Sequence, residues 1–313
     1  MTVLSIALMH IPDGFLNATI SALFWVLTAV TLTIAVRRSQ AQFDERLAPL
    51  AGIMAAFIFA AQMINFPVAG GTSGHLLGGA LAAIILGPWV GILVMACVIG
   101  VQGLLFQDGG LLVMGANIFN MGIVTALVGY GLYRMANGRH RNAKLAIAGI
   151  AAWLSVMAAA LLTSLQLWLS GTAALGLVVP AMLGVHALIG LGEALITVAA
   201  LAFIFRVRPD LLHEGGTQGG RGWIVAGMLV ALAVVLLAPY ASASPDGLER
   251  VAEDMGFIQT AVAAPYEVLP DYTIPFIGSE NLSTLLAGAA GILVVAVLAV
   301  LLIRYTRRST SRS

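Results

Sequence analysis

Long apolar segments alternate with short polar breaks along almost the whole chain. A helix needs about 20 apolar residues to cross the hydrocarbon core of a membrane, and unpaired backbone groups are excluded from lipid. Nine segments fit such helices: residues 17–36, 47–64, 75–86, 88–106, 111–134, 145–169, 177–206, 222–239 and 285–303. The third is short and ends at Gly87-Pro88, which indicates a helix that begins below the surface and packs in protein. The pattern predicts an all-α integral membrane protein, a seven-helix bundle followed by a two-helix hairpin.

Composition supports the membrane assignment and excludes several kinds of site. The chain is 60% hydrophobic and 9% charged, whereas soluble domains are about a quarter charged. The single cysteine, Cys97, lies inside an apolar run, so this chain holds neither a disulfide framework nor a cysteine-based metal site. We expect contact with membrane lipid and none with nucleic acid.

The cations predict the orientation, because cytoplasmic loops carry an excess of Lys and Arg. Fourteen of the fifteen fall in four segments that nine spans would place on one side: Arg37, Arg38, Arg46, Arg134, Arg139, Arg141, Lys144, Arg206, Arg208, Arg221, Arg304, Arg307, Arg308 and Arg312. The N-terminus is then outside and the C-terminus cytoplasmic, in a multi-pass protein of a bacterial or archaeal cytoplasmic membrane. An even number of spans would break this parity.

Two blocks follow from the same pattern. Residues 9–206 form the seven-span unit, and residues 207–221 form a cytoplasmic linker rich in glycine and charge. Residues 222–313 form a two-span unit around an acidic extracytoplasmic loop, 240–284.

The first candidate chemistry lies at Met9-His10. A peptide with histidine in second position binds a metal through its terminal amine, the deprotonated amide of the histidine and a ring nitrogen, which leaves one place open in a planar set. Planar nitrogen coordination favours nickel(II) or copper(II), and imidazole also suits cobalt(II). This requires Met9 to be the true terminus, so we expect that residues 1–8 are absent from the mature chain. The alternative is an interfacial histidine that caps the first helix.

His75 is the expected fourth ligand. It lies in Gly71-Thr72-Ser73-Gly74-His75, where glycines allow the backbone to approach the first loop and Thr72 or Ser73 can cap the following helix. A capped helix with a hydrogen-bonded histidine is the alternative.

Polar residues inside the apolar segments are further candidates, because they cost free energy in lipid unless they are paired. Asn117 and Asn120 are expected to face the bundle interior; Asn117 is a candidate for orienting a ligand histidine, and Asn120 for bonding between helices. His186 and Glu193, seven residues apart on one helix face, form a relay, pair with each other or support the site. Asp13 and Ser73, beside the two ligand histidines, are candidates of the same supporting kind.

Several motifs follow one another in this order: Met9-His10-Ile11-Pro12-Asp13-Gly14, Gly71-Thr72-Ser73-Gly74-His75-Leu76, Leu86-Gly87-Pro88-Trp89, Asp108-Gly109-Gly110, Gly115-Ala116-Asn117-Ile118-Phe119-Asn120-Met121-Gly122 and His186-Ala187-Leu188-Ile189-Gly190-Leu191-Gly192-Glu193. Together they closely resemble the CbiM/NikM family, the substrate-capture components of energy-coupling factor transporters for cobalt and nickel. Ser244-Pro245-Asp246-Gly247-Leu248-Glu249 resembles the PDGLE, or CbiN/NikN-like, small component, here fused to the same chain.

The resemblance implies Met9, His10 and His75 as metal ligands, with the ion as transported substrate and no resident cofactor. It implies uptake of nickel(II) or cobalt(II), in support of cobalamin biosynthesis or nickel enzymes, and it leaves the choice of metal open. It also implies a transmembrane coupling (T) component and two ATP-binding cassette ATPase subunits as partners. No Walker-type phosphate-binding loop occurs in this sequence, so we expect a transporter component without a catalytic site of its own, with ATP hydrolysed by other chains.

Two other functions are alternatives for a chain of this kind. An intramembrane hydrolase would use Ser73 as nucleophile and a histidine as base, but Ser73 and His75 are two residues apart at a predicted helix start and would not face each other. A proton-coupled metal carrier that acts alone differs from the first hypothesis in needing no ATPase partner.

Overall fold

The structure is a computed structural model that describes residues 9–40, 47–207 and 222–308. The predicted linker 207–221, except Val207, and residues 1–8 lie outside the described residues. The helices are α1 (Ala18–Gln40), α2 (Leu47–Gln62), α3 (Gly79–Leu86), α4 (Pro88–Leu105), α5 (Met114–Asn117), a π-helix (Ile118–Val124), α6 (Thr125–Tyr133), α7 (Arg141–Leu169), α8 (Leu175–Val207), α9 (Gly222–Val235), α10 (Gly247–Asp254) and α11 (Glu280–Arg308). Two short strands are β1 (Phe66–Val68) and β2 (Thr72–Gly74).

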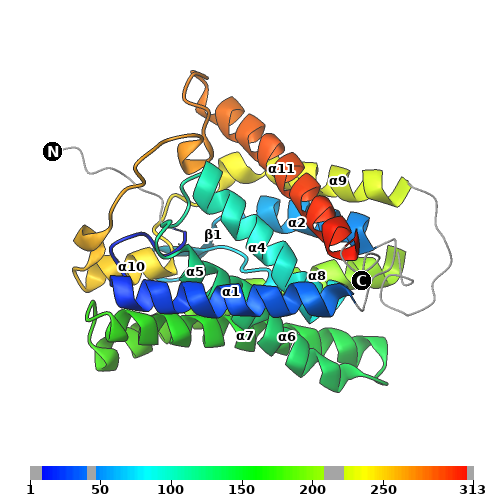
Figure 1. The fold of residues 1–313 in the computed structure, drawn as a ribbon, viewed down its shortest axis with the longest axis horizontal. Coiled ribbons are helices and arrows are strands. Elements are labelled where there is room, and N and C mark those ends of the chain that lie inside the picture. The colour runs from blue at the N-terminus through cyan, green and yellow to red at the C-terminus, as the bar shows by residue number, and fades with distance from the viewer. Residues whose placement is uncertain (1–8, 41–46, 208–221, 309–313) are drawn as a thin grey trace.

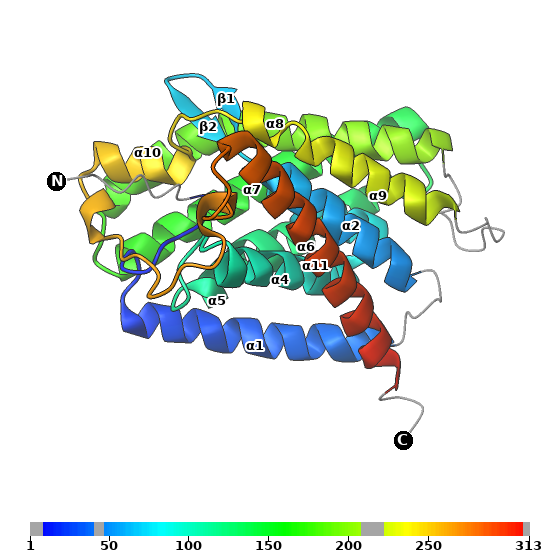
Figure 2. The ribbon, with the colours of Figure 1, turned by 90° about the horizontal axis from the view of Figure 1, so that it is seen from above.

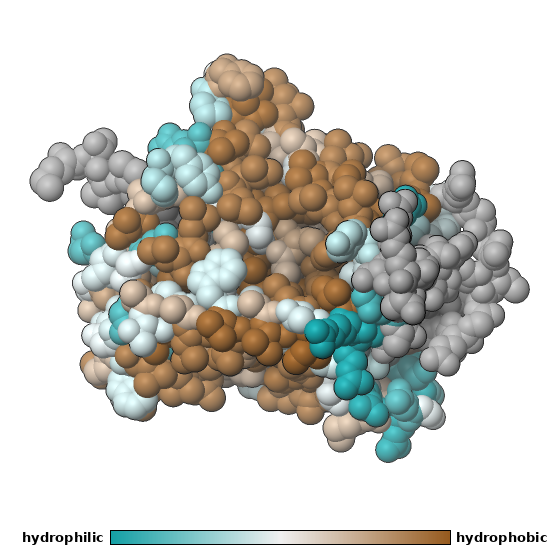
Figure 3. Space-filling view, viewed as in Figure 1, coloured by the Kyte–Doolittle hydropathy of each residue, from teal (hydrophilic) through white to brown (hydrophobic). Residues whose placement is uncertain are grey.

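The predicted all-α membrane architecture is confirmed, with a helix at each of the nine predicted places. Among the described residues, seven helical stretches are long and apolar enough to cross a membrane. At 16 residues, α2 is short for a span, and α3 has only 8 residues, so nine full spans are not confirmed. Figure 3 shows apolar side chains over most of one face of the protein, as a lipid-facing surface requires.

The short helix α3 lies at the centre of the bundle. All eight of its residues are buried, and it packs against α4 and α6. Gly87 has a φ of 78°, a left-handed conformation that glycine adopts readily. Pro88 then starts α4, because its missing N–H costs nothing at a helix start. The predicted stop at Gly87-Pro88 is therefore confirmed.

The segment before α3 differs from the prediction. Thr72 and Ser73 lie in β2, which pairs antiparallel with β1, and Ser73 lies opposite Pro67. Because α3 begins only at Gly79, capped by Gly78, neither Thr72 nor Ser73 caps a helix, and that prediction is wrong. The glycines before them form the turn of the hairpin, where Gly70 and Gly71 have positive φ.

The C-terminal helices pack on the first block of the chain. Helices α9 and α11 lie on either side of α2, and each packs more on α2 than on the other (Figure 2). The connection between them carries α10 to the end of the bundle at which α1 begins, whereas α1 and α11 both end at the opposite end (Figure 1). At α10, Asp246 and Glu249 form a reciprocal capping box with the backbone at the helix start. The predicted hairpin is therefore two helices with α2 between them.

Candidate metal centre

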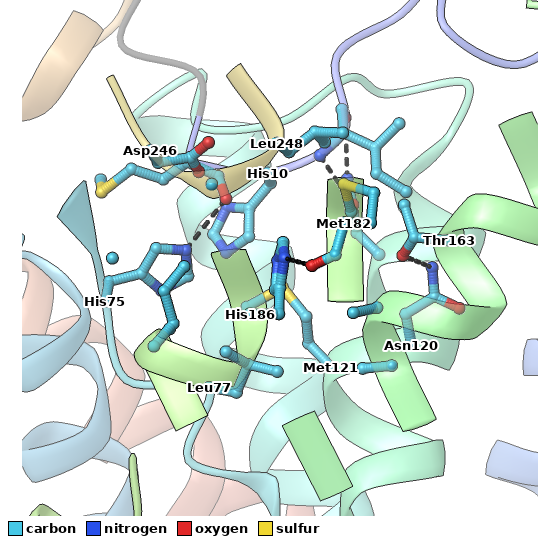
Figure 4. A pocket seen from close by; sticks show the side chains of 18 residues that line it. His10, His75, Leu77, Asn120, Met121, Thr163, Met182, His186, Asp246 and Leu248 are labelled. Carbon is cyan, nitrogen blue, oxygen red and sulfur yellow. Dashed lines mark hydrogen bonds between the residues drawn. The ribbon is translucent and has the colours of Figure 1, made fainter. Parts of the chain in front are cut away.

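A cavity of about 60 Å³ lies at the end of the bundle where α10 is placed. The chain start, the α2–α3 connection, α8 and α10 surround it (Figure 4). This is room for an ion with a few waters. His10 and His75 line it together, although 65 residues separate them in the sequence. Their ring centres are 5.5 Å apart at an interplanar angle of 74°, and the two residues are only 2% and 6% exposed.

The backbone that carries His10 is held from both sides. The Ile11 N–H donates to Oδ1 of Asn117 at 3.0 Å, and Nδ2 of Asn117 donates to the Ile11 carbonyl at 3.0 Å. The same carbonyl accepts the N–H of Gly110 at 2.9 Å. Asn117 therefore replaces a strand partner for the loop that follows His10.

Asp13 fixes the far end of this loop. Its carboxylate accepts the backbone N–H groups of Leu111, Leu112 and Val113 at 3.1, 2.9 and 3.2 Å. These groups precede α5, so a negative charge lies where helix N-termini favour it. The close approach needs glycine at position 110, because a Cβ there would lie 2.2 Å from the backbone nitrogen and Oδ1 of Asp13.

His75 reaches across to the peptide that joins Met9 to His10. Its Nε2 lies 3.0 Å from the Met9 carbonyl oxygen, and its Nδ1 lies 3.0 Å from the Leu76 carbonyl oxygen. Next to it, the buried carboxylate of Glu193 accepts the N–H groups of Leu77 and Gly78 at 2.6 and 2.9 Å. Glu193 on α8 therefore fixes the connection between His75 and α3.

The other polar candidates make separate contacts. Nδ1 of His186 donates to the Met182 carbonyl one turn earlier at 2.8 Å, so His186 and Glu193 do not pair with each other, although His186 does line the cavity. Asn120, in the π-helix, donates to Oγ1 of Thr163 and Oε1 of Gln166 on α7, which confirms bonding between helices. The Ser73 hydroxyl donates to the Ser244 carbonyl at 2.7 Å, an unsuitable arrangement for a hydrolase nucleophile.

Two neighbours of the site, Asp108 and Asp246, lie in motifs that carry the family resemblance but were not expected at the site. Nδ1 of His10 lies 3.1 Å from the carbonyl oxygen and 2.8 Å from Oδ1 of Asp108. Asp108, in turn, accepts a hydrogen bond from the hydroxyl of Tyr272 in the C-terminal block. Asp246 also lines the cavity, brought there by the start of α10. The Asp108-Gly109-Gly110 run was the available signal, but in sequence it is an ordinary turn.

The electrostatics differ between the two rings. Burial lowers the pKa of His10, but the carboxylate and carbonyl of Asp108, with the charge of Asp246, together raise it more, so the pKa of His10 is above its ordinary value. Burial lowers the pKa of His75, and the neighbouring His10 lowers it further. The lowered pKa favours the neutral form of the His75 ring, the form in which imidazole binds a metal.

Side chains alone do not complete a metal site. Within the described ranges, three or more His, Cys, Asp or Glu residues nowhere come together as a possible set of ligands. Two imidazoles and the Met9–His10 peptide are what the geometry brings together.

Comparison with known protein families divides the chain in two. Residues 10–211 match the family model described as the cobalt uptake substrate-specific transmembrane region, CbiM. Residues 221–308 match the PDGLE domain.

Individual relatives are named as metal transport proteins. A putative fused nickel transport protein NikMN of Archaeoglobus fulgidus is 39% identical over 303 residues, which cover 96% of this chain and 99% of the relative. The cobalt transport protein CbiM of Sorangium cellulosum is 34% identical, over 66% of this chain and 95% of its own length. Among solved structures, a truncated transition metal transporter matches with a TM-score of 0.58 and 33% identity, over 63% of this chain and 99% of the other.

Proposed function

The chain belongs to the CbiM family of substrate-specific transmembrane regions for cobalt uptake and carries a PDGLE domain behind that region, and from this premise we propose that it captures nickel(II) or cobalt(II) for uptake across the cytoplasmic membrane. Its relatives are named as nickel or cobalt transport proteins. The proposed ligands are the amine of Met9, the amide nitrogen and ring of His10, and Nε2 of His75.

One distance carries the proposal: Nε2 of His75 lies 3.0 Å from the carbonyl oxygen of Met9. The ring therefore already reaches the peptide whose nitrogen would bind the ion. Within that peptide, Nδ1 is the ring nitrogen of His10 that closes a six-membered chelate with its own amide nitrogen. Four nitrogen ligands in one plane suit nickel(II), and the imidazoles suit cobalt(II) equally.

The ligand set requires a free amine on Met9, because an acylated nitrogen is a poor ligand. N-terminal sequencing or intact-mass measurement of the protein purified from its membrane tests this directly. A mature chain that begins at Met9 agrees with the proposal, and a chain that retains Met1 contradicts the amine ligand.

We also propose roles for the other site residues, for the two units of the chain and for its partners. Asp13, Asn117 and Glu193 would fix the loops that carry the ligands. Ser73 would hold the strand before His75 on the C-terminal block through the Ser244 carbonyl, and His186 would border the ion on the side of α8. The capture unit is residues 9–206, with the chain start outside, and residues 222–313 form the PDGLE unit, joined to it by the linker 207–221. A transmembrane coupling component and two ATPase subunits would drive release into the cytoplasm.

Uptake of radiolabelled nickel(II) and cobalt(II) by cells that express the chain with these partners tests the function. We expect His10→Ala and His75→Ala to abolish uptake. His140→Ala is the matched control, because His140 is exposed in the loop before α7 and should leave uptake unchanged. Uptake at the wild-type level in either ligand variant contradicts the site, and uptake that persists without the ATPase subunits favours a carrier that acts alone.

A further inference from the structure

A chain of three buried side chains joins the C-terminal block to the proposed metal site. The hydroxyl of Tyr272 donates to Oδ2 of Asp108 at 2.6 Å, and Asp108 lies against Nδ1 of His10. Tyr272 and Asp108 are 5% and 3% exposed, and 164 residues separate them. A residue of the PDGLE unit therefore acts on a proposed ligand through one intermediate.

The backbone around this contact is strained. Among the residues that the structure describes, the non-glycine residues with positive φ are Gln107 at 56°, Asp271 at 50° and Tyr272 at 57°. All three adjoin or belong to the Tyr272–Asp108 pair. Left-handed backbone at non-glycine residues is disfavoured, and it persists where surrounding contacts impose it, often at switching or ligand sites.

Backbone hydrogen bonds and ring stacking impose this strain. The N–H groups of Leu269 and Asp271 donate to the carbonyls of Leu105 and Phe106 at 2.9 and 3.2 Å. The ring of Tyr272 stacks on that of Phe106, with centres 4.8 Å apart and planes 20° apart. The segment before α11 is thereby fixed on the loop after α4.

The His10 ring is held through the nitrogen that the ion would need. Nδ1 faces two oxygen atoms of Asp108, at 3.1 and 2.8 Å. The carbonyl oxygen can only accept, so Nδ1 carries the hydrogen and donates it there. The carboxylate oxygen Oδ1 lies beside the same nitrogen at ion-pair distance. Nε2 is buried without a hydrogen-bond partner in the described part of the chain. A nitrogen that carries a hydrogen has no lone pair for a metal.

We propose that Tyr272 and Asp108 form a latch, which holds the His10 ring in the unloaded state and must release Nδ1 before the ion is bound. The inference rests on the proposed function, in which Nδ1 closes the planar chelate. On loading, the metal–Nδ1 bond replaces the Nδ1–H bond, and the ring becomes a neutral ligand with its one hydrogen on Nε2. A ring that carried hydrogens on both nitrogens gives the Nδ1 proton to water, and a neutral ring moves its hydrogen to Nε2 by exchange with water. The strained turns at Gln107 and at Asp271–Tyr272 relax when the latch opens, which weakens the hold of the latched state. Tyr272 is thus a positioning residue through which the PDGLE unit sets the affinity of capture.

Replacement of one hydroxyl tests the latch. Tyr272→Phe keeps the ring that stacks on Phe106 and removes the bond to Asp108. Tyr266→Phe is the matched control, because its hydroxyl donates to the Leu104 carbonyl at 3.0 Å rather than to Asp108. The full chain is purified in detergent, nickel(II) affinity is measured by competition with a chelator, and the visible absorption of planar nickel(II) reports the ligand set.

We expect Tyr272→Phe to bind nickel(II) about tenfold more tightly than the wild type, the scale of a lost hydrogen bond to a charged group. Its absorption spectrum should match that of the wild type, and Tyr266→Phe should show the wild-type affinity. Asp108→Asn is the second variant, which keeps the shape of the side chain and weakens the same contact, and it should also bind more tightly. General loss of structure would weaken binding, so it does not mimic this result.

Each other result overturns a defined claim. Nickel(II) affinity in Tyr272→Phe that equals or falls below that of the wild type overturns the latch, and so does unchanged or weaker binding by Asp108→Asn. If the His10→Ala variant still binds nickel(II) as tightly as the wild type, the proposed function itself is overturned, and the latch with it. The two failures are thus separated by the His10 variant.

Discussion

The side chain of Asn117 binds the backbone of Ile11 through both of its polar atoms, each at 3.0 Å. Ile11 directly follows His10, so these two bonds fix the peptide to which the His10 ring is attached. Three residues further on, Asn120 donates instead to Thr163 and Gln166 on α7. Two identical side chains therefore serve the loop of the site and the packing of the bundle.

This difference predicts separate effects of the same substitution. Asn117→Ala leaves the buried N–H and carbonyl of Ile11 without these partners, at a cost of about 1–3 kcal/mol. We expect nickel(II) affinity to fall about tenfold, because part of the binding free energy is then used to order the loop around the ion. Equilibrium dialysis of the purified protein measures it.

Asn120→Ala is the matched comparison. It should lower the melting temperature in detergent, because it removes bonds between the π-helix and α7, and change nickel(II) affinity far less. Equal losses of affinity in the two variants would contradict the separation of roles.

The start of α10 is predicted to respond to pH. Burial raises the pKa of Asp246 from 3.8 to about 7, and burial together with the charge of Asp246 raises the pKa of Glu249 from 4.5 to about 7. The folded state therefore binds protons that the unfolded segment releases. The resulting stability is fully present below about pH 4 and is lost as pH rises to about 7.

Hydrogen exchange of the α10 amides, corrected for the intrinsic rate at each pH, measures this effect. Protection should be greater at about pH 5 than at about pH 8. The double variant Asp246→Asn, Glu249→Gln removes both titrations and should give protection that is independent of pH. A slope of the same size in the double variant would show that other groups cause it.

The sequence predicts the helices well because their signal is local. Each apolar segment must form its own backbone hydrogen bonds in lipid, so composition and length suffice to locate it. Turn residues such as Gly87 and Pro88 then mark the ends. The count of nine full spans is not confirmed, and α3 gives the physical reason: it is surrounded by protein, where an apolar helix needs no membrane-spanning length.

The site contains features that no local pattern encodes. A charged residue inside an apolar helix marks Glu193 as functional or paired. Its partners, however, are the backbone N–H groups of Leu77 and Gly78, and because almost every residue has a backbone N–H, the sequence does not show which ones it binds. Asp108 and Tyr272 meet across 164 residues, and neither lies in an unusual sequence context. The hairpin before His75 resembles a helix cap in sequence, because the same glycines and hydroxyl residues suit both.

The close contact between Gly110 and Asp13 gives the last prediction. A Cβ at position 110 would lie 2.2 Å from Oδ1 of Asp13, so Gly110→Ala must displace the chain start that carries His10. We expect the free energy of unfolding to fall by about 2–3 kcal/mol, because overpacking against backbone is not relieved by a rotamer change. We also expect nickel(II) binding to be lost. Gly100→Ala on α4, where a Cβ meets nothing within 4 Å, should be neutral or slightly stabilising. Melting temperature and nickel(II) affinity measure both variants, and wild-type values for Gly110→Ala would contradict the packing described for this loop.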